Sequence, residues 1–96
     1  MITKDQAIKL ANSKFWKQLS IGNIVRFQLF EDRLCMDWTD FHMAVESALN
    51  RPVFSHEFAW PDDLRQEFLM GKSAPTFEER LNLIPESIRK EMFNDS

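Results

Sequence analysis

The densest run of apolar residues in the chain lies between residues 21 and 50, and the other segments are expected to pack against it. When residues 21–34 are placed on a helix at about 100° per residue, their apolar side chains point in nearly every direction. A helix that is apolar on most of its sides is buried on most of them. We therefore predict that residues 24–30 form the central and most buried helix of the fold.

The second half of this run predicts a helix over residues 38–49 with a single apolar face. Asp37 precedes it and is a residue type that caps helix N-termini. The helix is expected to end at Asn50, which tolerates a left-handed backbone, and Pro52 prevents its continuation.

The N-terminal segment predicts another helix, over residues 4–18. Thr3 and Gln6 form a capping-box pattern at its start. Trp16 lies off the apolar face, so it is either buried under a neighbouring helix or exposed for contact with a partner. The residues expected on the buried face are Ile8, Ala11, Phe15 and Leu19.

The C-terminal half predicts short helices after an extended passage over residues 51–60. One of these helices is expected to stop at Gly71, which favours the backbone found at helix C-termini. Residues 31–36, before this half, are expected to form a loop or one short extended piece and to direct Leu34, Cys35 and Met36 inward. The predicted helix starts are Ser55, Pro61, a second capping box of Thr76 with Glu79, and Pro85.

Length and composition agree with a folded domain. Ninety-six residues make one domain. The 44% of apolar residues, with nine Phe and three Trp, exclude the composition of disordered chains. We predict an all-α fold in which residues 1–96 form one compact domain of four to six short helices around a buried central helix.

The same composition bears on where the protein works. The chain has no run of about 18 apolar residues and no basic-then-apolar N-terminal segment, so neither a membrane span nor a secretory signal is expected. Cys35 is the single cysteine and cannot form an internal disulfide. A reducing cytoplasm is therefore the expected location.

The sequence lacks the patterns that enzymes and metal sites share. Cys35 has no neighbouring histidine, and acidic residues close before it raise a thiol's pKa, so a core position is expected. His56 and Glu57 resemble half of a metalloprotease helix motif, but Trp60 stands where the second histidine is required. His42 is expected to be half-buried and bonded to a backbone or carboxylate group. We predict no enzyme activity, no catalytic residue, no cofactor and no metal.

Two passages, RFQLFEDRLCMDW at residues 26–38 and DFHMAVESALNRPVFSHEFA at residues 40–59, resemble a group of small uncharacterised proteins carried by tailed bacteriophages and prophages. The resemblance covers residues 15–59 and includes no catalytic motif. It implies a bacterial host cell as the setting. Small phage proteins of this size often act by binding and blocking a host protein or a defence complex such as a CRISPR effector, so an anti-CRISPR-like inhibitor is implied.

The net charge of −3 hides segments of opposite sign. Residues 1–30 carry five basic side chains and one acidic, whereas residues 31–46 carry five acidic side chains and one basic. We predict that the acidic segment and the polar side of the helix after it bind a partner protein; the alternative is a solvated face that only keeps the protein soluble. The residues expected at this surface are Glu31, Asp32, Asp37, Asp40, Met43 and Glu46.

Two other functions compete with this prediction. A small helical DNA-binding regulator would use the basic residues of the first helix, and Arg26, for phosphate contacts. The acidic total argues against it, because a grip on the nucleic-acid backbone needs a positive face. A minor enzyme or ligand-binding protein would need a site built between subunits, for example in a homodimer.

Overall fold

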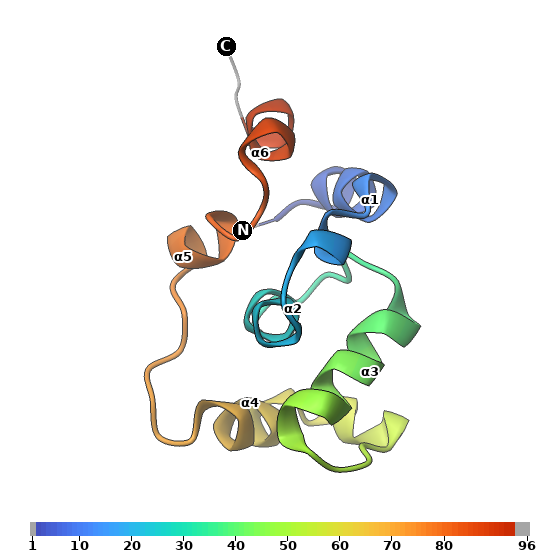
Figure 1. The fold of residues 1–96 in the computed structure, drawn as a ribbon, viewed down its shortest axis with the longest axis vertical. Coiled ribbons are helices and arrows are strands. Elements are labelled where there is room, and N and C mark those ends of the chain that lie inside the picture. Colours follow the sequence, from blue (N-terminus) through green and yellow to red (C-terminus); the bar gives the residue numbers. More distant parts are fainter. Residues whose placement is uncertain (1, 94–96) are drawn as a thin grey trace.

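The computed structural model describes residues 2–93, and the regular elements within them are helices, with no strand (Figure 1). The predicted all-α fold of short helices is confirmed. No helix of this described part is long and apolar enough to cross a membrane. In chain order the elements are α1 (Lys4–Ser13), the 3-10 turn η1 (Phe15–Gln18), α2 (Ile21–Gln28), α3 (Trp38–Leu49), the 3-10 turn η2 (Ser55–Ala59), α4 (Pro61–Leu69), α5 (Phe77–Leu81) and α6 (Glu86–Phe93).

α2 is the central helix, as its apolar pattern predicts, and Figure 1 shows it between α1 on one side and α3 and α4 on the other. The hydroxyl of Ser20 caps its first turn by accepting a hydrogen bond from the Asn23 N–H, at 3.2 Å. Val25 and Phe27 on α2 are fully buried, and the helix packs against α3 and α5. The ring of Phe27 meets Phe15 edge-on, with 5.0 Å between centroids.

The buried part of this segment is shorter at both ends than the apolar run in the sequence. Ile21 lies in the first turn of α2 and is 49% exposed. Phe30 is only partly buried, 6.3 Å from the ring of Phe68 on α4. Leu34, which was expected to point inward, is exposed. At the C-terminal end the reason is that α2 ends at Gln28, so the residues beyond it no longer follow a helical period.

The buried side chain of Gln28 organises the loop after α2. Its Nε2 atom donates to the carbonyl oxygens of Arg33, at 2.8 Å, and Glu31, at 3.4 Å. Its Oε1 atom accepts a hydrogen bond from the Cys35 N–H, at 2.7 Å. These bonds satisfy backbone groups that a loop inside the fold would otherwise leave unpaired. Cys35 and Met36 are therefore buried, as predicted.

The first helix is shorter than predicted, because α1 ends at Ser13 instead of residue 18. Lys14 adopts the left-handed conformation, with φ 56°, and the chain continues as η1. The buried face of α1 also differs from the predicted one. Ala7 and Leu10 are buried, whereas Ile8, which was expected in the core, is half-exposed.

The predicted helix caps are present. The side chain of Asp37 accepts a hydrogen bond from the Asp40 N–H, at 3.1 Å, and so begins α3. Asn50 ends the same helix in the left-handed conformation, with φ 56°. The two capping boxes are Thr3 with Gln6 and Thr76 with Glu79.

The C-terminal helices begin at or next to the predicted residues. α4 is ended by Met70, which takes the left-handed conformation one residue before the predicted Gly71. α5 ends at Leu81, and Ile84 is buried in the segment that follows it. α6 then packs against α1, which brings the two ends of the described chain together.

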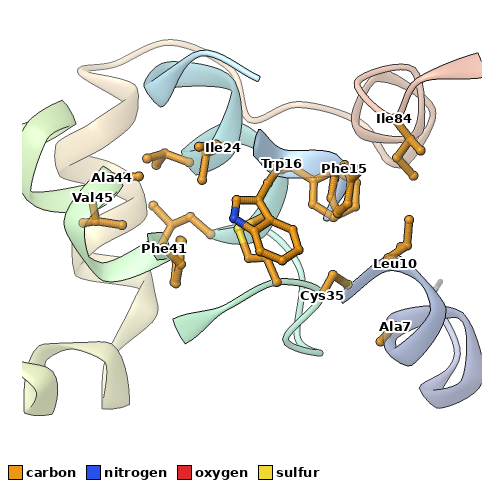
Figure 2. Packing of buried hydrophobic residues seen from close by; sticks show 14 of the residues in the cluster. Ala7, Leu10, Phe15, Trp16, Ile24, Cys35, Phe41, Ala44, Val45 and Ile84 are labelled. Carbon is orange, nitrogen blue, oxygen red and sulfur yellow. The ribbon is translucent and has the colours of Figure 1, made fainter. Parts of the chain in front are cut away.

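One core joins these elements. Figure 2 shows it running from Leu10 on α1, past Trp16 and Phe15 on η1, to Val45 on α3. Ile84 reaches the same core from the segment after α5. Trp16 is therefore buried under neighbouring elements, which was one of the two alternatives left open by its position.

Candidate protein-binding surface

The prediction that Glu31 belongs to the acidic surface is wrong, because this residue is buried. Its carboxylate lies 3.4 Å from Nη2 of Arg80 on α5. Arg80 also donates to the carbonyl of Pro75, at 3.2 Å, and its guanidinium lies over the ring of Phe77. The ion pair holds α5 against the end of α2, so Glu31 does not contribute to the exposed surface.

Asp32 and Asp37 are exposed but face different elements. The carboxylate of Asp32 lies 3.9 Å from Nη2 of Arg65 on α4. Asp37 lines a hollow beside η1 together with Lys14 and Lys17. The structure therefore separates Asp32 from the α3 residues of the predicted surface and keeps Asp37 with them.

Asp40 connects α3 to η1. Its Oδ2 atom accepts a hydrogen bond from the indole N–H of Trp16, at 2.9 Å, and lies 4.0 Å from Nζ of Lys17. Trp16 is almost fully buried, so this bond satisfies an indole N–H that would otherwise have lost water without gaining a partner. Asp40 is part of the fold as well as of the surface.

Glu46 plays a similar part at the other end of α3. Its carboxylate accepts a hydrogen bond from the Val53 N–H, at 2.9 Å, and lies 3.8 Å from Nε2 of His42. The same imidazole nitrogen is hydrogen-bonded to the carbonyl of Val53. His42 is half-buried and bonded to backbone, as predicted. Through their bonds to the backbone of Val53, Glu46 and His42 hold the passage after α3 against this helix.

Met43 is the exposed apolar residue on the outer side of α3, at 60% exposure. It lies at the rim of a hollow of about 320 Å³ between α3 and the chain that runs from η1 into α2. Ile21 forms part of the same rim, and Figure 2 shows Ile24 and Ala44, which also line the hollow, at the junction of α2 and α3. The full lining is Trp16, Lys17, Leu19, Ile21, Ile24, Asp40, Met43, Ala44 and Ser47.

Two further hollows continue this one along α3. The hollow that contains Asp37 shares Trp16, Lys17 and Asp40 with it. A hollow at the C-terminal end of the helix, lined also by Glu46 and Pro52, shares Met43 and Ser47 with it. We call these three connected hollows the α3 groove; its centre is apolar and its two ends are polar.

Sequence reasoning identified Met43 but missed the other side of the groove. Ile21 lies just before residues 24–30, the predicted buried helix, and no surface role was predicted for it. Ser20, Gly22 and Asn23 surround it, and these polar or small neighbours were the available signal that the first turn of α2 is exposed.

Cys35, the single cysteine of the chain, is buried. Burial, together with the negative charge of Glu31, raises the pKa of Cys35 to about 12, so its thiol stays protonated at neutral pH. Among residues 2–93, no group of three or more His, Cys, Asp and Glu side chains is placed to hold a metal ion. The groove itself offers apolar contact and scattered charges.

Residues 23–76 match the model of a family described as a domain of unknown function, DUF7736. The match covers more than half of the chain. The chain belongs to the DUF7736 family. No curated protein and no solved structure matches it.

The DUF7736 match contains most of α2 and all of α3, η2 and α4. Met43 and the C-terminal hollow of the α3 groove lie within it. η1 and Ile21 lie before it, so the central hollow combines the matched region with residues outside it.

Proposed function

We propose that this DUF7736 domain binds another protein through the α3 groove and inhibits or modulates that protein by covering part of its surface. The observation that carries the proposal is the apolar hollow with exposed Ile21 and Met43 at its rim. Exposed apolar residues that gather at one place, with polar residues around them, mark interaction sites. A protein interface has the same plan, with an apolar centre and a polar rim.

The residues of the groove would contribute in different ways. The unbranched thioether side chain of Met43 adapts its shape to the surface that it meets. An apolar contact at the centre of an interface mainly slows dissociation. Lys17 and Asp37 at the rim would mainly affect the association rate and its dependence on salt.

The resemblance of residues 15–59 to small phage proteins supports a host protein or a defence-system complex in a bacterial cell as the partner. Charges of both signs lie along the groove, with Lys14 and Lys17 beside Asp37 and Asp40. This mixture favours local occlusion of a protein surface over imitation of the DNA backbone, which would need a one-signed array of negative charge.

Capture from a bacterial lysate tests the proposal if a matched pair of variants is included. Met43→Asp places a charge in the apolar centre of the groove. Met70→Asp makes the same chemical change at the end of α4, where the side chain is 84% exposed and lies outside the groove. We expect quantitative mass spectrometry to find a protein that the parent and Met70→Asp retain and Met43→Asp loses. Equal retention by all three folded proteins would contradict a role for the groove.

Duplex-DNA binding provides the opposing outcome. A DNA-binding regulator would bind duplex DNA with an affinity that falls steeply between about 50 and 200 mM salt. Replacing Lys14 and Lys17 by alanine would then weaken that binding and make it less dependent on salt. We expect fluorescence anisotropy to show no such binding by the parent protein; salt-dependent binding that needs these lysines would favour the regulator instead.

A further inference from the structure

A further hollow lies beyond the C-terminal end of the α3 groove, where η2 meets α4. Its volume is about 310 Å³, and Trp60 and His56 are among its walls. Trp60 is 64% exposed, although a tryptophan usually has most of its surface covered. The ring of His56 stacks on exposed Phe54, with 5.7 Å between centroids and 9° between planes. The aromatic rings of Trp60 and His56 at this hollow are therefore largely exposed.

The charged side chains of this hollow form a cluster around Arg51. Glu67 accepts hydrogen bonds from Nε and Nη2 of Arg51, each at 2.9 Å. Glu57 accepts from Nη2 at 2.9 Å and from Nη1 at 3.3 Å, and the Pro52 carbonyl also accepts from Nη1, at 2.9 Å. All the nitrogen atoms of this guanidinium are thus engaged, so Arg51 has little capacity left to attract an anion. Two carboxylates and one guanidinium leave the cluster with a net negative charge.

Asp63 adds a further negative charge to the same hollow. Within residues 2–93 its carboxylate has no hydrogen-bond or ion-pair partner, whereas that of the adjacent Asp62 lies 3.1 Å from Nη1 of Arg65. Arg51 also holds the pKa of Glu57 and the pKa of Glu67 below their ordinary value, so both stay ionised at neutral pH. The hollow therefore combines an exposed indole with an excess of negative charge.

We propose that this hollow receives an arginine side chain of a partner protein, with its guanidinium stacked on Trp60 and paired with Asp63. A cation is favoured because the hollow is negative, and an aromatic wall attracts a cation that lies over its face. Guanidinium suits the site better than ammonium, because it is planar, stacks on aromatic rings and gives up its hydration shell more readily. Arg51 also lines the C-terminal end of the α3 groove, but Trp60 and Asp63 lie outside that groove, so the proposal stands without the one made for it.

Titration with short capped peptides tests this proposal on the intact chain. The probes are Gly-Arg-Gly, Gly-Lys-Gly and Gly-citrulline-Gly, the last of which has nearly the shape of arginine without its charge. We expect the arginine peptide to shift the indole N–H signal of Trp60 in a ¹H–¹⁵N spectrum and to saturate at about millimolar concentration, an affinity typical of weak binding. The lysine peptide should bind several-fold more weakly, and the citrulline peptide should leave the signal in place.

Three variants test the roles of Asp63 and Trp60. Asp63→Asn should reduce the affinity for the arginine peptide roughly ten-fold, while Asp62→Asn, which removes the same charge outside the hollow, should leave it unchanged. Trp60→Leu should abolish the binding; because this variant lacks the indole, the backbone N–H signal of Asp63 is followed in it and in the parent. The indole signals of Trp16 and Trp38 serve as the check that each variant remains folded. A response to citrulline equal to that to arginine, equal binding of lysine and arginine, or full binding by Asp63→Asn would each overturn the proposal.

Discussion

The two faces of α3 show how one helix can serve the fold and a surface at the same time. The inner face carries Phe41 and Val45, which are buried against the core. The outer face carries Met43, which borders the α3 groove and contacts solvent. A substitution on the inner face should therefore change the free energy of unfolding, whereas one on the outer face should change binding alone.

The side chains between these faces belong to both. Asp40 binds the buried Trp16, and Glu46 binds the backbone of Val53, while each carboxylate is still more than one-third exposed. A charge reversal at either residue would remove a structural hydrogen bond as well as a surface charge. Met43 is the cleaner position for testing the surface, because no hydrogen bond depends on it.

The largest expected effect comes from replacing a buried side chain of the core. Phe27→Ala should lower the free energy of unfolding by about 3 to 5 kcal/mol, because Phe27 is fully buried against Phe15 and the smaller side chain leaves a cavity. Urea denaturation monitored by circular dichroism measures it. A domain of this size has little more stability than that, so much of the variant is expected to be unfolded. A loss below about 1 kcal/mol would show that α2 is not the centre of the core.

Asp40→Ala should have the next largest effect, a loss of about 1 to 3 kcal/mol. The buried indole N–H of Trp16 would then have no acceptor, and an unsatisfied buried donor is destabilising by this amount. Asp40→Asn keeps an oxygen that can accept the bond and should be nearly neutral in comparison. Equal losses in the two variants would mean that the charge of Asp40, and not its hydrogen bond, stabilises the fold.

Local sequence signals predicted much of this architecture and failed where distant contacts decide. Asp37 and Asn50 delimit α3 because caps depend on neighbouring residues. The end of α1 was missed because Lys14 adopts a left-handed conformation, which lysine rarely signals. Gln28 was missed as an organiser of the following loop, since its polar side chain is buried only when the loop folds over it.

The surface was predicted less well than the fold. Glu31 was expected outside, but its partner Arg80 lies 49 residues further along the chain, and no local pattern reveals that pair. The carboxylate of Asp40 accepts a hydrogen bond from Trp16, 24 residues earlier in the chain, and no local pattern reveals this contact either. Met43 was assigned to the polar side of its helix correctly, because helical periodicity alone fixes the face on which a residue lies.

Acid should weaken the C-terminal end of α3 through the cluster around Arg51. Hydrogen bonds from Arg51 lower the pKa of both Glu57 and Glu67 from the ordinary value of 4.5. A lowered folded-state pKa means that the stabilisation is present above pH 4.5 and is lost as the pH falls below it, because the unfolded chain then binds more protons. Unfolding free energies at pH 7 and pH 3 measure the loss. Arg51→Met should show a smaller difference between the two, and an unchanged difference would contradict this origin.

Cys35→Ala should have a small effect on stability and none on binding. The thiol is fully buried, so removing one heavy atom from the core should lower the free energy of unfolding by roughly 1 kcal/mol. In the parent protein the thiol should react with a disulfide reagent at pH 8 only as fast as the fold opens, since its pKa is about 12. Rapid labelling of the folded protein, or loss of partner capture by the alanine variant, would refute this description.

The dissociation rate of a captured partner tests the role of the outer face most directly. Met43→Ala should leave the free energy of unfolding within about 0.5 kcal/mol of the parent, because the side chain is largely exposed. It should leave the association rate nearly unchanged and raise the dissociation rate several-fold, since it removes an apolar contact at the centre of the groove. Met70→Ala is the matched control and should change neither rate. A dissociation rate for Met43→Ala equal to that of the parent would contradict the assignment of the α3 groove as the binding surface.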